Sequence, residues 1–232
     1  MSSSVVVRLP ARLHLGFLDP SGSDARRFGS IGLPLSEPET VVSLRRAPET
    51  HVEGPEAARA AHHLATMKEA LGVRSHHRLT VEQAIPAHAG LGSGTQIALA
   101  VAAALRTLHG LPLDAGGDAM ILSRGRRSGI GIASFDNGGI IIDAGQDGSG
   151  APPPVVARMP FPEEWRVPGA RPDHRRTAWR GRDYGVPDLA AISPHKRRRD
   201  LSIGLDGRHA GPGEPRFRGF RWCHRRNPTV GW

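Results

Sequence analysis

The sequence contains one cysteine, one tyrosine and few aromatic residues of any kind, which make up 5% of its 232 residues. Cys223 alone cannot form an intramolecular disulfide, and no Cys and His residues have the paired spacing of a structural zinc site. No stretch approaches the roughly 20 apolar residues that span a bilayer, and the N-terminus lacks a signal-peptide pattern. These absences favour a soluble protein of a reducing compartment, and we expect a cytoplasmic location.

The formal net charge is +9, but it is not spread evenly along the chain. Residues 1–167 contain 16 basic and 16 acidic side chains, so the whole excess lies in residues 168–232. A strong positive charge is typical of proteins that bind nucleic acids or anionic membranes. Because the excess is confined to the tail, we expect no membrane partner, and nucleic-acid binding only nonspecifically through the tail.

Residues 168–232 also differ from the rest in composition. Leu, Ile, Val and Phe account for only nine of these 65 residues, too few for a core of their own. Abundant Arg, Pro, Gly, His and Trp without periodicity are typical of a GC-rich gene read in the wrong frame. We therefore predict a domain over residues 1–167 and a basic tail over 168–232 that is disordered or a frameshift product. The alternative is a basic arm that binds nucleic acid, and the other reading frames of the coding DNA after Val167 distinguish the two.

Hydrophobic patterning within residues 1–167 predicts an α+β fold. Residues 4–9 and 11–17 favour one bent strand, and residues 56–71 and 96–108 favour helices. The second helix is almost entirely apolar, so it must be buried on most of its circumference. A weaker helix is expected at 113–124, and further strands at 31–35, 40–44, 77–85, 139–143 and 155–159.

The most informative segment is Pro86-Ala-His-Ala-Gly-Leu-Gly-Ser-Gly-Thr95, between a predicted strand and the apolar helix. Successive glycines allow backbone N–H groups to point toward one place, and the start of a helix adds unpaired donors, so the segment suits a phosphate. The alternative is a tight connection with Thr95 as the helix N-cap. The substrate-binding candidates here are Gly90, Leu91, Gly92, Ser93, Gly94, Thr95 and Gln96.

Further candidates lie on the first strand and in a second glycine-rich loop at 124–131. Arg12 and His14 are two residues apart on a strand, so we expect them on one face, with Arg12 binding an anion and His14 donating to one or transferring a proton. The alternative for His14 is a structural or exposed imidazole. Arg126 and Arg127, followed by Ser128, are candidates to bind phosphate or carboxylate, and their alternative is a solvated basic turn.

The adjacent histidines His62-His63 and His76-His77 have no carboxylate or cysteine partners at the spacing of a metal site. We expect all four on the surface.

The first glycine-rich segment resembles the anion-binding signature of the GHMP kinase superfamily, Pro-x-x-x-Gly-Leu-Gly-Ser, in Pro86 and residues 90–93. The segment Ser128 to Gly139 is similar to a second segment of that superfamily, Gly-x-Gly followed by Gly-Gly. The superfamily kinases normally have a second serine where this chain has Gly94, and a carboxylate where it has Ile132 and Ala133. The resemblance therefore does not imply kinase chemistry.

Three segments together resemble one branch, the β-ribofuranosylaminobenzene 5′-phosphate synthases: residues 10–19, residues 90–96 and residues 125–131. The resemblance implies a GHMP-kinase-like N-terminal domain with a mixed sheet and packed helices, and a second domain that is missing or replaced here. It implies an enzyme that joins phosphoribosyl pyrophosphate to an aromatic carboxylic acid, 4-aminobenzoate or 4-hydroxybenzoate, releasing carbon dioxide and pyrophosphate on the route to methanopterin. A homodimer is the implied assembly.

The catalytic candidates that follow are His14, Asp19 and Arg127, with Asp19 stabilising positive charge on the ribose or helping to hold Mg²⁺ on pyrophosphate. We expect no resident cofactor other than such an Mg²⁺ ion. Two alternatives stay open: an ATP-dependent small-molecule kinase, and an inactive remnant whose basic tail binds nucleic acid.

Overall fold

The computed structural model describes residues 4–19, 26–162, 164–169 and 190–192. The predicted boundary at residue 167 falls at the start of β7 (Val167–Gly169), which pairs antiparallel with β8 (Ala190–Ile192). The rest of the tail, and with it the frameshift hypothesis, lies outside the described residues. In the described ranges, no helix has the length and apolar character needed to cross a membrane.

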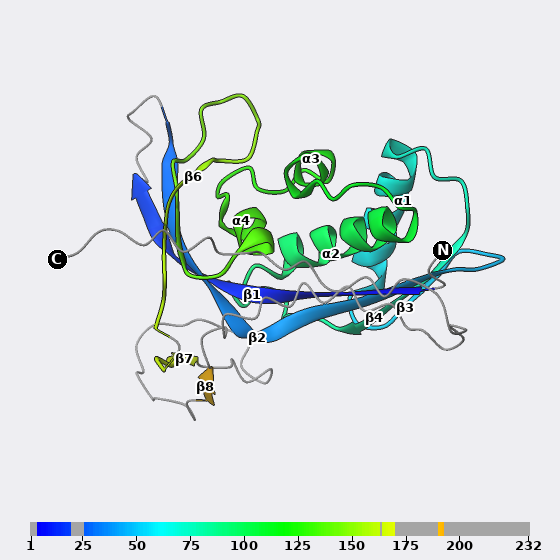
Figure 1. Cartoon of the computed structure of the whole chain (residues 1–232), viewed down its shortest axis with the longest axis horizontal. Helices are drawn as coiled ribbons and strands as arrows, with labels where there is room; N and C mark the ends of the chain where they lie inside the picture. The colour runs from blue at the N-terminus through cyan, green and yellow to red at the C-terminus, as the bar shows by residue number, and fades with distance from the viewer. Residues whose placement is uncertain (1–3, 20–25, 163, 170–189, 193–232) are drawn as a thin grey trace, which may run out of the picture.

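A six-stranded mixed sheet forms one layer of the structure (Figure 1). β2 is its longest strand and pairs antiparallel with β1, β4 and β5, while β3 runs parallel to β4 and β6 antiparallel to β5. The strands are β1 (Ser4–Asp19), β2 (Phe28–Arg46), β3 (His51–Glu53), β4 (His77–Gln83), β5 (Ile140–Asp143) and β6 (Val155–Met159).

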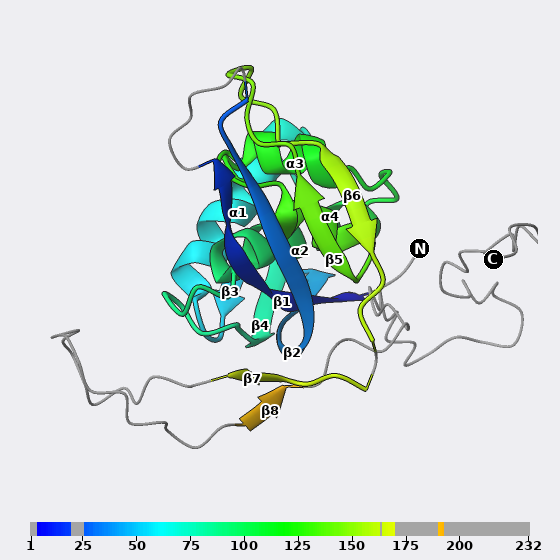
Figure 2. The ribbon, with the colours of Figure 1, turned by 90° about the vertical axis from the view of Figure 1, so that its left-hand side faces the viewer.

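The helices pack on one face of this sheet, as Figure 2 shows by placing β1, β2, β5 and β6 in front of them. They are α1 (Ala57–Ala70), α2 (Ser93–Leu108), α3 (Ala115–Ile121) and α4 (Ile130–Asp136). The mixed sheet with packed helices confirms the predicted fold class. The expected strands at 31–35 and 40–44 are one continuous strand, and α2 begins three residues earlier than expected. Neither β3 nor α4 was predicted, because both are short and α4 lies in a glycine-rich segment.

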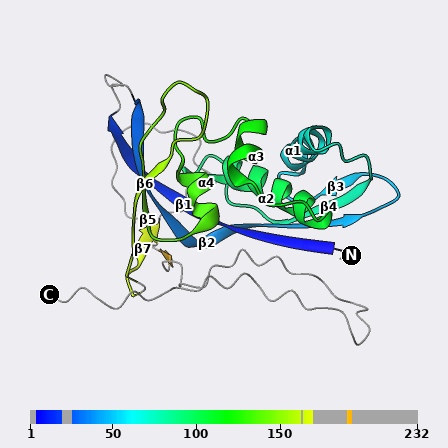
Figure 3. The same ribbon diagram turned by 45° about the horizontal axis from the view of Figure 1, so that its top comes forward.

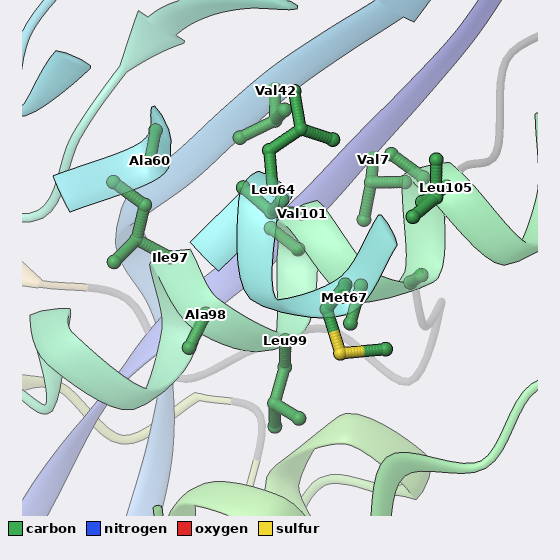
Figure 4. Close-up of a cluster of buried hydrophobic side chains, with 14 of the residues drawn as sticks. Val7, Val42, Ala60, Leu64, Met67, Ile97, Ala98, Leu99, Val101 and Leu105 are labelled. Carbon is green, nitrogen blue, oxygen red and sulfur yellow. The ribbon is translucent and has the colours of Figure 1, made fainter. Parts of the chain in front are cut away.

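The core lies between α2 and the sheet, with α1 packed against it (Figure 4). Val5, Val7 and Leu9 alternate along β1 and are fully buried, as the period of two for a strand requires. On α2, the small side chains of the segment 98–104 let the helix approach the strands closely, and nearly every residue of its last three turns is buried. The expectation of a helix buried around its circumference is therefore met.

One charged side chain on this apolar helix is neutralised within the fold. Arg106 is nearly buried, and its guanidinium donates to both carboxylate oxygens of Asp118 in α3 at 2.7 to 2.9 Å and to the carbonyl of Pro112 at 3.1 Å. These hydrogen bonds raise the pKa of Arg106, whereas burial raises the pKa of Asp118 and the contacts with Arg106 oppose that rise. The pair fixes α3 against α2.

Removing one member of this pair should cost far more than removing both. We expect Asp118→Ala to lower the free energy of unfolding by about 3–5 kcal/mol, because it leaves the arginine buried without its counter-ion. The double variant R106L/D118L should lose much less, since no charge stays unpaired. Urea denaturation followed by circular dichroism measures both, and a loss below about 1 kcal/mol for D118A would contradict the ion pair's role.

Two of the four histidines expected on the surface are buried, which corrects that prediction. His62 and His76 are exposed, but His63 in α1 and His77 in β4 are covered. Nε2 of His77 lies 2.9 Å from Nε2 of His109, which follows α2. Burial is the main cause that lowers the pKa of both His63 and His77 to about 4, with neighbouring positive charges adding to it.

These depressed pKa values predict a loss of stability in mild acid. An unfolded histidine takes up a proton near pH 6.5, whereas these two do so only near pH 4 in the folded protein, so the unfolded state binds more protons between those values. We expect the unfolding midpoint in urea to fall as the pH drops from about 6.5 to about 4. His77→Gln should flatten this pH dependence, whereas the same change at exposed His76 should not. Equal slopes for the two variants would argue against burial of His77.

Candidate functional site

The connection between β4 and α2 passes over the end of the buried helix and ends in its first turn. Gly90 and Gly92 have φ angles of 74° and 81°, in the left-handed region, whereas Leu91 between them has a negative φ. Such alternation turns successive N–H groups toward one side and forms an anion-binding concavity. Gly92 is the N-cap of α2, so Thr95 lies inside the first turn and the alternative role as N-cap is excluded.

The N–H groups of this loop are left available. Thr95 and Gln96 donate their N–H groups to the carbonyl of Gly92 at 3.1 and 3.2 Å. In the part of the chain that the structure describes, the N–H groups of residues 90–94 have no acceptor, nor do the hydroxyl groups of Ser93 and Thr95. Five amides with no internal partner, at the positive end of a 16-residue helix, suit a phosphoryl group.

Arg12 lies between this loop and the start of α4. Its backbone N–H donates to the carbonyl of Leu91 at 3.0 Å. A Cβ atom placed on Gly92 would lie 2.9 Å from Nε of Arg12, and one on Gly131 would lie 2.8 Å from the same atom. Glycine at both positions therefore lets the side chain of Arg12 lie against the two loops. Its Nε is buried and has no hydrogen-bond partner among the described residues.

A buried carboxylate, that of Asp143 at the end of β5, holds the second glycine-rich loop in place. One oxygen accepts from the N–H groups of Ser30 and Gly145, both at 3.0 Å. The other accepts from the hydroxyl groups of Ser30 and Ser128 and, at 2.8 Å, from the N–H of Gly129. The carboxylate thereby joins β2, β5 and the residues that precede α4.

The two loops are also joined directly by Gln96 of α2. Its side-chain amide donates to the hydroxyl of Ser134 at 3.0 Å and to the carbonyl of Gly131 at 3.4 Å. Gln96 is fully buried, so this link lies beneath the N-terminus of α2. The start of α2, the start of α4 and β1 thus meet around Arg12.

Sequence comparisons place this arrangement in a known family. A family model described as the GHMP kinases N terminal domain matches residues 56–139. β-Ribofuranosylphenol 5′-phosphate synthase from Methanothermobacter thermautotrophicus is 37% identical over 214 residues, which cover 80% of this chain and 63% of that protein. The synthase of the same name from Archaeoglobus fulgidus is 36% identical over 179 residues, which cover 72% of this chain and 57% of that protein. These matches support the assignment of the chain to the family of these synthases within the GHMP kinase superfamily.

The same comparisons confirm the resemblance inferred from the three sequence segments. The chain spans about three fifths of the length of these two relatives. Among solved structures, homoserine kinase from Cytophaga hutchinsonii superposes with a TM-score of 0.50 at 18% identity, over 77% of this chain and 62% of that one, and shares the fold.

In this GHMP domain, His14 lies in the same electrostatic environment as Arg12. Burial lowers the pKa of His14 first, the charge of Arg12 lowers it further, and Asp143 acts in the opposite direction. The ring packs against that of Phe17, with centroids 4.5 Å apart, and Nε2 is buried without a partner among the described residues. The strand thus brings Arg12 and His14 together, with His14 uncharged at neutral pH.

The remaining predicted site residues lie in three different settings. Ser128 and Gln96 use their side chains inside the protein: Ser128 bonds to Ser30 at 2.7 Å and to Asp143 at 3.3 Å, so both belong to the framework of the site. Arg126 and Arg127 are exposed and have no ion-pair partner among the described residues. Asp19 ends β1, seven residues beyond Arg12, and the end of that strand points away from α2 (Figure 3).

Sequence reasoning did not identify Asp143, Ser30 or Ser134. The available signal was Asp143 itself, because it directly follows three isoleucines in a predicted strand. A carboxylate in such a strand is expected to be buried, and hydrogen-bond donors must then offset the cost of removing its charge from water. Ser30 and Ser134 carry no such signal, because only the tertiary structure brings them to Asp143 and Gln96.

The contacts of Arg12 predict that Gly92→Ala weakens anion binding. The new methyl group would displace the arginine side chain, and we expect the affinity for inorganic pyrophosphate to fall at least about tenfold, as for loss of a charged hydrogen bond. Gly72→Ala is the matched control, because Gly72 has a similar φ of 66° with no atom near its missing Cβ. Titration calorimetry measures both, and equal affinities would show that Arg12 does not contribute.

Proposed function

We propose that this chain carries the phosphoribosyl-binding part of a β-ribofuranosylphenol or β-ribofuranosylaminobenzene 5′-phosphate synthase. The observation that carries the proposal is the set of unpaired loop amides beside Arg12, which forms no ion pair among the described residues and whose buried Nε has no hydrogen-bond partner there. The similarity to two β-ribofuranosylphenol 5′-phosphate synthases at 36–37% identity supports it. The proposed substrates are phosphoribosyl pyrophosphate and 4-hydroxybenzoate or 4-aminobenzoate, and the name of the relatives favours the hydroxy acid.

The proposed reaction breaks one bond at the sugar and one at the aromatic ring, and it forms one bond between them. The bond from C1 of the ribose to the pyrophosphate oxygen breaks, and pyrophosphate leaves with the electron pair. The ring carbon that carries the carboxylate bonds to C1, and the carboxylate then leaves as carbon dioxide, returning its electron pair to the ring. Charge develops mainly on pyrophosphate, which the loop amides and Arg12 would stabilise.

This chemistry does not require a strong base. Loss of carbon dioxide restores the aromatic ring, so no ring proton has to be removed. An uncharged His14 fits this demand, because a neutral imidazole can donate or accept a hydrogen bond without adding charge beside Arg12. We propose that His14 orients one of the two substrates.

Arg127, Arg126 and Asp19 remain proposals for other parts of the substrates. The exposed arginines would bind the 5′-phosphate or the aromatic carboxylate, as guanidinium groups bind such anions in a bidentate manner. An Mg²⁺ ion would come with pyrophosphate, since the described residues contain no group of three His, Cys, Asp or Glu side chains that could hold a metal. Asp19 would stabilise positive charge at the ribose. The methanopterin route and a homodimer stay proposals of the same kind.

The test is to incubate the chain with phosphoribosyl pyrophosphate and 4-hydroxybenzoate or 4-aminobenzoate labelled in the carboxyl group, without ATP. We expect release of labelled carbon dioxide that depends on the pyrophosphate substrate, and titration calorimetry should show binding of that substrate even if turnover is slow. In a parallel incubation with ATP, phosphorylation of a small molecule without carbon dioxide release would favour the kinase instead. No binding and no turnover would favour the inactive remnant.

A further inference from the structure

A second arginine, Arg124, reaches the anion-binding loop from the side of α3. A Cβ atom placed on Gly94 would lie 3.5 Å from Nη1 of Arg124. Since one C–C bond adds about 1.5 Å, Nη1 lies within about 5 Å of the Cα of Gly94. An oxygen atom bound by the loop amides at a usual distance of about 2.9 Å would therefore be within reach of this guanidinium. Arg124 was not among the residues singled out from the sequence.

The backbone of Arg124 is fixed by the way α3 ends. Ser123 has a φ of 54°, in the left-handed region, and its N–H donates to the carbonyl of Met120 at 3.0 Å. The N–H of Arg124 donates to the carbonyl of Ala119 at 2.6 Å. These two bonds define a Schellman motif, which orients the residue after the left-handed position. Arg124 therefore leaves α3 in a set direction, toward the N-terminus of α2.

Its charge is not neutralised by the protein. In the ranges that the structure describes, no carboxylate forms an ion pair with Arg124, and its Nε is buried without a partner. Burial and the charge of Arg59 lower its pKa. Among the described residues, its side-chain hydrogen-bond partner is neutral His63 of α1, whose Nε2 lies 3.4 Å from Nη2. A half-buried cation held by a neutral acceptor is electrostatically incomplete until an anion binds.

We propose that Arg124 is a substrate-binding residue that contacts the phosphoryl group held at Gly94, and that His63 positions it. This inference rests on the proposed function and deepens it, because it adds a second cation to the same loop. Arg12 lies beside Gly92 and Arg124 beside Gly94, so two guanidinium groups lie next to loop positions that are two residues apart. Two cations on one set of amides match a diphosphate better than a single phosphate.

Calorimetric titration with inorganic pyrophosphate and with phosphoribosyl pyrophosphate tests the proposal. We expect Arg124→Gln to weaken binding about 10- to 100-fold, the range for loss of a hydrogen bond to a charged group. The affinity of Arg124→Lys should lie between those of the unchanged protein and Arg124→Gln, because an ammonium keeps the charge but lacks the planar donor fork of a guanidinium. Arg74→Gln is the matched control: Arg74 is exposed, and its neighbour Ser75 lies 3.5 Å from His109 at the other end of α2.

Histidine NMR supplies a readout that a merely structural arginine would not move. Removing the charge of Arg124 should raise the pKa of His63 above its value of about 4, because that charge is one of the causes that lower it. Bound pyrophosphate should raise the same pKa in the unchanged protein by neutralising Arg124, and should have little effect in R124Q. If R124Q fails to fold, the affinity of R124K and the shift of the His63 pKa when pyrophosphate binds to the unchanged protein still test the role of Arg124.

The outcomes separate the two proposals. Binding by the unchanged chain that is lost in R124Q but kept in R74Q supports the role of Arg124. Equal binding by R124Q and R74Q, with no movement of the His63 pKa on adding pyrophosphate, overturns that role and leaves the proposed function standing. No binding of either probe by the unchanged chain overturns both.

Discussion

The site depends on one buried carboxylate that the protein itself fully uses. Asp143 accepts hydrogen bonds from Ser30, Ser128, Gly129 and Gly145, and no part of it is exposed. Such a charge is tolerated in the interior only when donors surround it, and these donors come from three separate segments. The free-energy cost of burying this carboxylate is therefore offset only when β2, β5 and the loop before α4 are all folded together. A residue with no expected contact to substrate thus sets the geometry of the loops that would make such contacts.

The turn that Asp143 holds in place is in turn packed against the anion-binding loop. Gly129 begins the turn into α4, Gly131 touches Arg12 and Thr95, and Gln96 ties the start of α2 to the same turn. Glycine lets these pieces approach closely: a Cβ atom on Gly129 would overlap the carbonyl of Pro153, and one on Gly131 would displace the side chain of Arg12. The loop can therefore present its amides in one fixed arrangement, which is the condition for binding an anion without a reorganisation cost.

The sequence predicts the parts of this structure that depend on long, regular patterns. Alternation in β1 and the apolar run of α2 are strong signals, and the glycine-rich segment before α2 follows from local conformation alone. The start of α2 was placed too late, because glycine and serine at 92–94 look like loop while the helix begins there. α4 was read as a loop for the same reason. His63 and Arg124 could not be found, since their burial and their contact depend on how α1, α2 and α3 pack.

The charges around the loop limit what the site can do more sharply than the fold does. Among the described residues, Asp143 is the carboxylate whose charge acts on Arg12 and His14, and its oxygens already accept hydrogen bonds from the protein. Burial lowers the pKa of His14 and His63 and keeps both neutral. The remaining charges are positive: Arg12 and Arg124 lie beside Gly92 and Gly94 of the loop, and Arg126 and Arg127 are exposed and close in sequence. A site with surplus positive charge, whose acting carboxylate Asp143 is already held by protein hydrogen bonds, suits a substrate that brings its own negative charge and needs no proton removed. The proposed displacement of pyrophosphate by an aromatic acid that loses carbon dioxide would meet both conditions, whereas transfer of a phosphoryl group to an alcohol would need a residue such as His14 to accept the hydroxyl proton.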